Sequence, residues 1–291
     1  MERLERDFRS RSRVVRMDIR TTYLRTSRSF RPPVNEPNRR TLWGVFDSDA
    51  DATRLLYVFS GPGRLAGTTL LMHDRIAPNE PDAMWVYLRS FGIFKQFDSS
   101  KQRVRVPGTA LTYEDSRGFI PLDKYRFFRN DEPSQDAPAI LACPRSPRVQ
   151  EDVGYRSLLL RVDPAKKLVR EVRYEGLGGG LLKTYRLVRE IEIGAAFFPA
   201  EVELTHLAEG FRSDIRYEHW ILESPPPAGF FTPNTDQSPF LDRLRAQVEA
   251  IGEGERIRAE LARADEQVRE FEEKLRRIQE SGGAARQPRK K

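Results

Sequence analysis

Residues 14–24 read VVRMDIRTTYL, and this stretch indicates the fold class. Apolar side chains at positions 15, 17, 19 and 23 alternate with the polar side chains between them. An alternation with a period of two is typical of a β-strand that buries one face. The folded part of the chain is therefore predicted to begin with a strand.

Similar runs, rich in aromatic and β-branched residues, recur between segments of Gly, Pro, Asn, Asp and Ser. They cover residues 41–46, 54–59, 68–72, 84–88, 91–97, 103–106, 157–162, 168–174, 181–193, 200–207 and 214–222. The prolines of the longer connections at 30–40 and 131–138 end a strand ladder because proline has no amide hydrogen to donate. No helix-length amphipathic segment separates the runs, which favours an antiparallel sandwich or barrel over a parallel α/β sheet.

Length and charge limit the number of domains and the classes of partner. A chain of 291 residues fits one or two domains. Lys and Arg number 50 against 43 Asp and Glu, and twelve Arg lie among the first 40 residues. The aromatic residues lie mainly in the predicted strands, away from the basic ends, so no stacking platform for nucleic acid is evident and no nucleic-acid partner is predicted.

Neither a membrane helix nor an export signal is evident in the sequence. No apolar run approaches the roughly 18 residues that a membrane helix needs. The first residues also lack the apolar segment of an export signal. On these grounds alone a cytoplasmic protein is expected, unless the start of the sequence is truncated.

The pattern changes after residue 222. Residues 223–240 are rich in proline and predict an extended linker. Over residues 241–280 apolar residues recur at spacings of three and four, which predicts an amphipathic helix or a short coiled coil. The pattern leaves open whether this helix pairs with another helix or packs on the strands. Residues 281–291 are predicted to be a disordered basic tail.

Motifs for covalent chemistry are missing from the sequence. The one cysteine, Cys143, excludes an internal disulfide and a thiolate metal cluster. No Gly-x-Ser-x-Gly nucleophile motif occurs. The glycine-rich segments 61–67 and 176–184 do not match dinucleotide or phosphate loops, and they predict connections between strands. No catalytic residue, metal or cofactor is predicted.

The three histidines offer only a weak alternative. His73 precedes Asp74, but neighbours on a strand point to opposite faces, so the two are not expected to act as a pair. His206 and His219 each follow apolar residues at a period of two across a predicted turn, and they are predicted to share a face. A zinc site would need a third ligand that the sequence does not offer. A hydrolase that uses His206 or His219 remains the least favoured function.

Several predicted strands are apolar on both faces, as over residues 55–59. A sheet covered on both sides needs another layer, a plug or a ligand. An ordinary filled core and a cavity both fit this pattern.

Three segments resemble a known family. They are GTTLLM at 67–72, WVYL at 85–88 and GTALTYED at 108–115. In order and spacing they are similar to the outer-membrane lipoprotein-sorting protein family, relatives of the periplasmic lipoprotein carrier LolA. Weaker similarity extends over residues 13–222, about three-quarters of the chain.

The resemblance implies an incompletely closed antiparallel β-barrel over residues 13–222, with a short helical plug and with residues 1–12 as the stub of a first helix. It also implies a periplasmic shuttle that binds lipid or lipoprotein acyl chains and meets transport partners at the inner and outer membranes, without a cofactor. The matching positions are expected to have structural roles in turns and in anchoring a short helical segment. They are Gly67, Gly108, Thr109, Tyr113, Glu114 and Asp115.

The favoured function is thus a non-enzymatic carrier that binds acyl chains in the concave face of an open barrel. The alternative is an interaction scaffold that recruits a protein partner through the helix at 241–280. Alternation along the strands nominates the following residues for the lining of the cavity: Met17, Ile19, Tyr23, Trp43, Tyr57, Phe59, Trp85, Tyr87, Val202, Leu204, Ile215 and Tyr217. A slip of one residue would exchange the faces of a strand.

Overall fold

A computed structural model describes most of the chain up to residue 250. The described residues are 12–24, 39–49, 51–61, 65–75, 82–88, 92–98, 102–106, 108–117, 120–121, 123–130, 138–194, 196–222, 225–233, 237 and 239–250. The chain divides into two compact units, residues 1–235 and residues 236–291.

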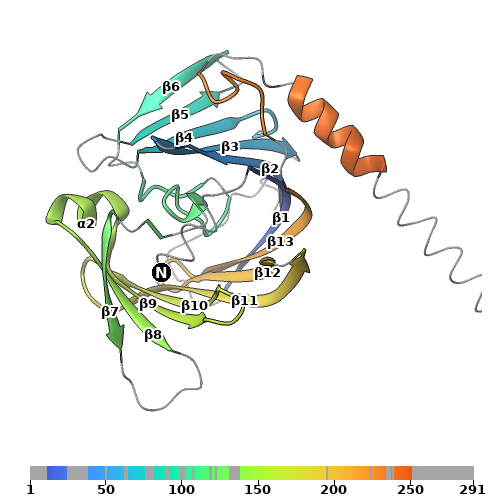
Figure 1. The fold of residues 1–291 in the computed structure, drawn as a ribbon. Helices are drawn as coiled ribbons and strands as arrows, with labels where there is room; N and C mark the ends of the chain where they lie inside the picture. Colours follow the sequence, from blue (N-terminus) through green and yellow to red (C-terminus); the bar gives the residue numbers. More distant parts are fainter. Residues whose placement is uncertain are drawn as a thin grey trace, which may run out of the picture. The chain divides into compact units, whose positions relative to one another are not determined.

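The first unit is built on one antiparallel sheet of 13 strands (Figure 1). The strands follow the order β6-β5-β4-β3-β2-β1-β13-β12-β11-β10-β9-β8-β7. This order consists of two meanders joined where β1 pairs with β13, and the outermost strands β6 and β7 do not pair with each other. The predicted class, an incompletely closed antiparallel barrel, is therefore confirmed. The strands are β1 Arg13–Tyr23, β2 Arg39–Ser48, β3 Ala52–Gly61, β4 Thr69–Arg75, β5 Ala83–Leu88, β6 Ile93–Phe97, β7 Tyr125–Asn130, β8 Ala139–Pro144, β9 Tyr155–Asp163, β10 Leu168–Gly176, β11 Leu181–Ile193, β12 Ala196–His206 and β13 Phe211–Leu222.

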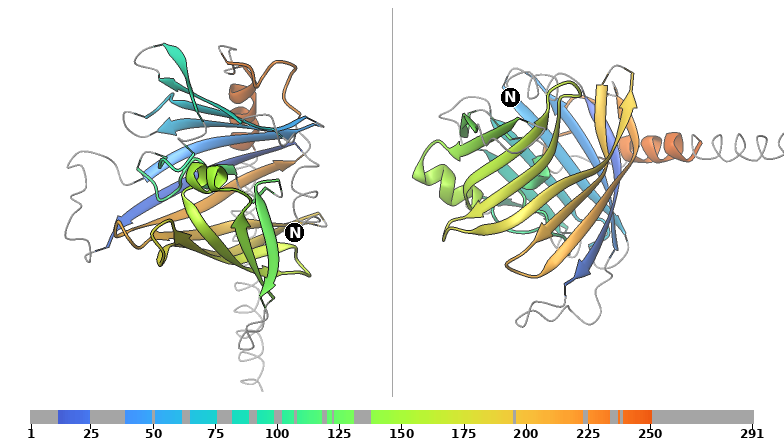
Figure 2. Two further views of the ribbon diagram at one scale, coloured as in Figure 1. Left: turned by 90° about the vertical axis from the view of Figure 1, so that its left-hand side faces the viewer. Right: turned by 90° about the horizontal axis from the view of Figure 1, so that it is seen from below.

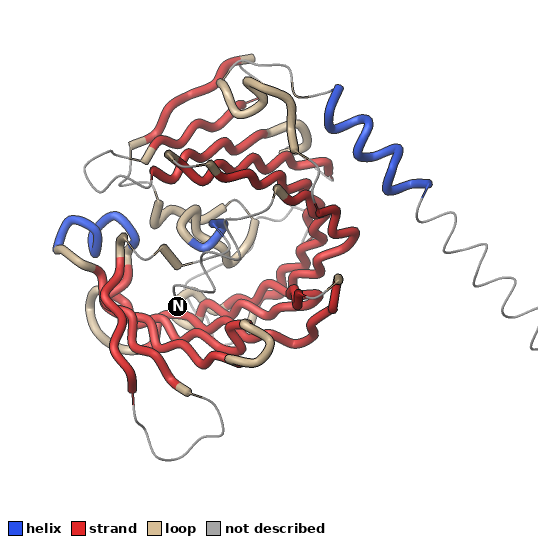
Figure 3. The backbone as a smooth tube through the Cα atoms, viewed as in Figure 1, coloured by secondary structure: helices blue, strands red, loops and turns tan. Residues whose placement is uncertain are grey.

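The sheet curls strongly around its concave side (Figure 2). Register shifts interrupt the ladder between Val14 and Arg16 on β1 and between Leu187 and Glu190 on β11. An extra residue in one strand bends it and increases its twist, which accounts for the curvature. Figure 3 shows a loop region inside the curve, which we call the plug and define as residues 102–106 and 108–117. The plug contains the short 3-10 helix η2, Asp115–Arg117.

Residues 103–106, predicted as a strand, belong to the plug instead. Their backbone bonds to the next turn of the chain: the amide of Val106 donates to Leu111 O, and the amide of Tyr113 donates to Val104 O. An isolated bridge joins Arg105 to Thr112. The prediction of a strand here is wrong: residues 103–106 form turns and one isolated bridge, and they bond to the plug itself and not to the sheet.

The region between the plug and β9 contains elements that the sequence pattern did not predict. These are β7, β8 and the helix α2, Pro147–Val153. Ser146 caps the start of α2 by accepting a hydrogen bond from the amide of Val149, and Pro147 occupies the first turn. Gly154 ends the helix with φ 81°. Serine before a helix and glycine after it are the usual signals, but a helix of two turns is too short to show a periodic face.

Residues 239–250, in the second unit, are helical, and Arg245 forms an ion pair with Asp242 at 2.7 Å. The rest of the helix predicted at 241–280, the tail at 281–291 and residues 1–11 of the stub predicted at 1–12 lie outside the described residues. Among the residues that the structure describes, no helix is both long and apolar enough to cross a membrane.

Candidate functional site

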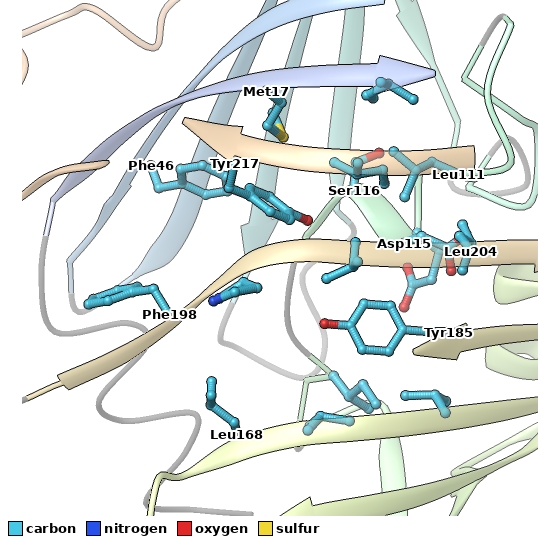
Figure 4. Close-up of a pocket in the computed structure, with 18 of the residues that line it drawn as sticks. Met17, Phe46, Leu111, Asp115, Ser116, Leu168, Tyr185, Phe198, Leu204 and Tyr217 are labelled. Atoms are coloured by element: carbon cyan, nitrogen blue, oxygen red, sulfur yellow. The ribbon is translucent and has the colours of Figure 1, made fainter. Parts of the chain in front are cut away.

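The concave face of the sheet contains a cavity of about 370 Å³ (Figure 4). Cross-strand partners bring its wall together. Met17 on β1 lies between Leu42 on β2 and Tyr217 on β13, and Ile19 lies opposite Ile215. Because directly opposed residues share a face of the sheet, these side chains form one continuous apolar wall.

Eight of the predicted lining residues contribute to this cavity. They are Met17, Ile19, Tyr57, Phe59, Val202, Leu204, Ile215 and Tyr217. Their positions in the cavity wall agree with the alternation of apolar residues along the strands, from which they were predicted. Whether they contact a ligand stays a prediction.

Four predicted residues, Tyr23, Trp43, Trp85 and Tyr87, lie outside the cavity lining. Trp43 follows the lining residue Leu42, so its side chain points to the opposite face. The ring of Trp85 packs on His73 at 4.9 Å, and that of Tyr87 packs on Phe94 at 5.1 Å.

On β5 the residues that join the concave core are Met84 and Val86, so the predicted face of this strand was inverted. Tyr23 ends β1 and packs on Phe211 at 6.4 Å.

The cavity also has walls that alternation along single strands did not find. Leu42, Phe46 and Leu70 come from β2 and β4, while Val106, Leu111 and Ile120 come from the plug and the segment after it. Tyr185 and Trp220 add aromatic surface from β11 and β13. The plug residues have no strand periodicity, so only their position inside the curved sheet identifies them.

One end of the cavity reaches the surface. The turn between β9 and β10 lines this end, and Ala165 and Lys167 in it are exposed. Phe198 packs on Trp220 at 5.1 Å, and the ammonium group of Lys166 lies 5.2 Å from the ring centre of Phe197. This end, which we call the mouth (residues 165–169, 196–199 and 220), combines aromatic side chains with lysines.

A buried ion network holds the plug to the sheet. The guanidinium of Arg117 is fully buried and pairs with Asp74 on β4, with Asp82 at 2.7 Å and with Glu114 at 2.8 Å. Lys124 pairs with Asp82. Burial alone would raise the pKa of Asp82, but the positive charges of Arg117 and Lys124 hold it well below its ordinary value. Such a network fixes the plug because each buried charge needs its partners.

Asp123 lies next to this network and behaves differently. Burial, together with the negative charge of Asp74, raises the pKa of Asp123 to about 6. Lys124 acts in the opposite direction but does not cancel this shift. Asp123 therefore takes up a proton at a higher pH than an ordinary carboxyl group does.

A second buried charge anchors the plug to β11. Lys183 is fully buried, forms an ion pair with Asp115 and donates to the hydroxyl of Tyr155 at 2.5 Å. Its ammonium group also lies 4.3 Å from the ring centre of Tyr174. Asp115 in turn accepts a hydrogen bond from the Tyr155 hydroxyl at 3.0 Å and from the amide of Thr112 at 2.7 Å. Burial lowers the pKa of Lys183, and the charge of Asp115 opposes this shift.

The remaining residues of the family motif occupy turns and backbone contacts. Gly67 and Gly108 have φ 82° and 73°, values that favour glycine. The hydroxyl of Thr109 donates to Val106 O at 2.9 Å, and the amide of Tyr113 donates to Val104 O at 3.0 Å. Glu114 pairs with Arg117 as described above.

His206 and His219 do not form one site. His206 lies at the hairpin end of β12, where it stacks on Phe211 with ring centres 5.3 Å apart. His219 lies toward the other end of β13, with φ 53°. Eight residues of strand separate His219 from the partner of His206, which corresponds to roughly 26 Å at ~3.3 Å per residue. In the described part of the chain, no group of three or more His, Cys, Asp or Glu is placed to hold a metal ion.

An open antiparallel sheet curled around a plug and an apolar cavity defines the class of LolA-like folds, and three solved structures share it. A domain from Vibrio parahaemolyticus described as an outer membrane lipoprotein-sorting protein is 19% identical, with a TM-score of 0.66, over 79% of this chain and 93% of the other. A DUF1329 family protein from Desulfovibrio piger is 16% identical, with a TM-score of 0.68, over 79% and 93%. A LolA superfamily protein from Nitrosomonas europaea is 17% identical, with a TM-score of 0.56, over 76% and 90%.

These likenesses confirm the fold that the motif resemblance implied. The model of a family described as "Uncharacterized protein" matches residues 51–235, and the chain belongs to this family. No curated protein matches the sequence.

Proposed function

We propose that this protein is a non-enzymatic carrier that binds the acyl chains of a lipid or lipoprotein in the concave cavity. The observation that carries the proposal is the cavity itself, which is lined mostly by aliphatic and aromatic side chains from strands on both sides of β1. Its volume of about 370 Å³ lies within the range of about 300–1,000 Å³ that is common for ligand pockets.

The energetics of an apolar cavity suit a reversible carrier. Each methylene group removed from water contributes about 0.8 kcal/mol. About ten buried methylenes thus contribute roughly 8 kcal/mol, from which the cost of association is subtracted. Binding of this kind needs no covalent step, so the ligand leaves again when a better acceptor surface is present.

The likeness to the Vibrio parahaemolyticus domain, which is described as an outer membrane lipoprotein-sorting protein, supports lipoprotein sorting as the setting of this carrier. On this proposal the protein acts in the periplasm, receives its cargo at the inner membrane and delivers it to an acceptor at the outer membrane. The exposed Lys167 and the aromatic side chains of the mouth suit a membrane surface, where rings lie at the headgroup level and cations meet anionic lipids.

Native mass spectrometry of the purified protein, followed by organic extraction, tests the proposal. We expect acyl-chain lipids to copurify with the protein, or to bind when phospholipid or an acylated peptide is added. Val202→Phe fills part of the cavity and is expected to reduce the bound fraction. Val188→Phe is the matched control because Val188 is 52% exposed on β11.

A wild-type protein that carries no lipid and takes up neither added phospholipid nor acylated peptide would contradict the carrier. Equal loss of lipid in both valine variants would also contradict it, because the effect would not come from the cavity. Circular dichroism of each variant checks that the sheet has formed.

A further inference from the structure

Two tyrosines of the cavity wall have hydroxyls that form no hydrogen bond with the part of the chain that the structure describes. Tyr185 on β11 and Tyr217 on β13 both line the cavity, and both are half-buried. Their hydroxyls point into the same space in Figure 4. Among the described residues neither hydroxyl has a hydrogen-bond partner, and neither oxygen is among the fully buried polar atoms, so both hydroxyls are open to water or to a ligand in the cavity.

The other tyrosines of the cavity wall are in different surroundings. The hydroxyl of Tyr57 donates to the carbonyl of Ser116, and that of Tyr155 donates to Asp115. The negative charges of the plug carboxylates Glu114 and Asp115 act on the hydroxyls of Tyr125 and Tyr174. The same charges would repel an acceptor oxygen of a ligand.

The pair at Tyr185 and Tyr217 lies in an apolar part of the cavity. Burial raises the pKa of Tyr217 to about 12. Burial also raises the pKa of Tyr185, and the neighbouring phenol of Tyr217 adds to that shift. Both hydroxyls therefore stay protonated at neutral pH and are available as donors.

We propose that the hydroxyls of Tyr185 and Tyr217 form a hydrogen-bonding subsite for the carbonyl oxygen of an ester- or amide-linked acyl chain. This inference rests on the proposed carrier function and names the class of its ligand. A carbonyl oxygen has two lone pairs and accepts two donors, and a neutral acceptor suits an apolar wall better than a charged group does. The subsite distinguishes an acylated ligand from an alkyl chain of the same length.

The test compares two probes that differ in one carbonyl oxygen. Palmitoyl lysophosphatidylcholine carries an ester, and hexadecyl lysophosphatidylcholine carries an ether with the same headgroup and chain length. The full chain is mixed with both at equal concentration, and native mass spectrometry measures the ratio of the two complexes. One hydrogen bond typically changes an affinity by about 5-fold, so we expect the wild type to prefer the ester by about 5-fold or more.

The double variant Tyr185→Phe/Tyr217→Phe removes both hydroxyls and keeps both rings. We expect it to bind both probes with a ratio near one, while its affinity for the ether stays close to that of the wild type. Tyr87→Phe is the matched control because Tyr87 lies outside the cavity lining, and it should keep the preference for the ester.

Equal binding of the two probes to the wild type would overturn the subsite and leave the carrier standing. A preference that survives in the double variant would overturn it as well. Failure of the wild type to bind either probe, or any acyl-chain lipid, would instead contradict the carrier function itself. Thermal unfolding of the double variant separates a binding effect from a folding effect.

Discussion

Arg117 of the plug and Asp74 of β4 form an ion pair in which both side chains are fully buried, although 43 positions separate them in the sequence. Three carboxylates surround this guanidinium, since Asp82 and Glu114 also pair with it. The fold therefore depends on a charge that sits inside the curve of the sheet. The plug closes one part of the cavity, so the same contact determines the shape of the candidate site.

Arg117→Ala is expected to destabilise the protein strongly. Removal of one partner of a buried ion pair typically costs about 3–5 kcal/mol, because the other charges stay buried without compensation. Urea unfolding followed by circular dichroism measures the change. Arg216→Ala is the control: Arg216 pairs with Glu201 at 3.0 Å, but its side chain is 69% exposed. An exposed pair contributes about 0–1 kcal/mol. Similar losses in the two variants would show that the network does not hold the plug.

Asp123→Asn is expected to make stability less dependent on pH. The pKa of Asp123 is raised by burial to about 6 in the folded protein, against about 3.9 in an unfolded chain. When the pKa of a carboxyl group is raised in the folded protein, its protonated form favours the folded state. This contribution to the free energy of unfolding is complete below about pH 4 and is lost as the pH rises through about 6. Asparagine avoids the loss, so the variant should be more stable than the wild type at pH 7.

The gain from Asp123→Asn should be about 1 kcal/mol, since partial exposure of the side chain screens part of the effect. Thermal unfolding at pH 4 and at pH 7 provides the measurement. Asp82 has the opposite effect on the pH dependence of stability. Its pKa is held low, so its contribution to the free energy of unfolding is lost only as the solution becomes acidic. A variant that follows the wild type at both pH values would contradict the raised pKa of Asp123.

Lys183→Met should be costly by itself and less costly when Asp115 is also made neutral. The single change leaves the carboxylate of Asp115 buried beside Tyr155 without its cation. We expect a loss of about 3 kcal/mol. Asp115→Asn in the same chain removes the uncompensated charge and keeps an acceptor for the amide of Thr112, so about 1–2 kcal/mol should return. A double-mutant cycle by urea unfolding measures this coupling, and strictly additive losses would contradict it.

The sequence predicts this fold well where the evidence is local. Alternation over residues 14–24 and in the later runs predicts the strands, and the motif at 108–115 indicates the open-barrel class. Which residues lie opposite one another depends on how distant strands pair, and local alternation does not give this pairing. Trp43 and Leu42 are equally apolar neighbours, and only the pairing of β2 with β1 turns Leu42 toward the cavity.

The family motif indicates Glu114 and Asp115, but their charged partners in the site were not predicted from the sequence for a similar reason. Lys183 and Asp115 are in contact although 68 positions separate them in the sequence. Nothing in the sequence around either residue indicates the other as its partner. A lone lysine in an otherwise amphipathic strand was the available signal, because its position at a period of two from Tyr185 places it on the buried face. The contacts of the plug could not be predicted from the sequence either, since an irregular segment has no periodicity to interpret.

Gly108→Ala tests whether the backbone of the plug fits the sheet as closely as the structure shows. Gly108 has φ 73°, and its carbonyl accepts a hydrogen bond from the hydroxyl of Thr21 at 2.8 Å. A methyl group there would lie 2.6 Å from an atom of the buried guanidinium of Arg40. Backbone strain at such a position costs about 1–3 kcal/mol, and displacement of Arg40 adds to this.

Gly178→Ala is the matched control for this change. Gly178 lies in the turn between β10 and β11, and an added methyl group would meet nothing within 4 Å. Its φ is outside the left-handed region, so alanine should be neutral or slightly stabilising. We expect urea unfolding to show a loss for Gly108→Ala alone, together with weaker lipid retention, because a displaced plug no longer closes the cavity. If the two glycine variants unfold alike, the plug is not held against Arg40 and Thr21, and the wall of the cavity must be formed in another way.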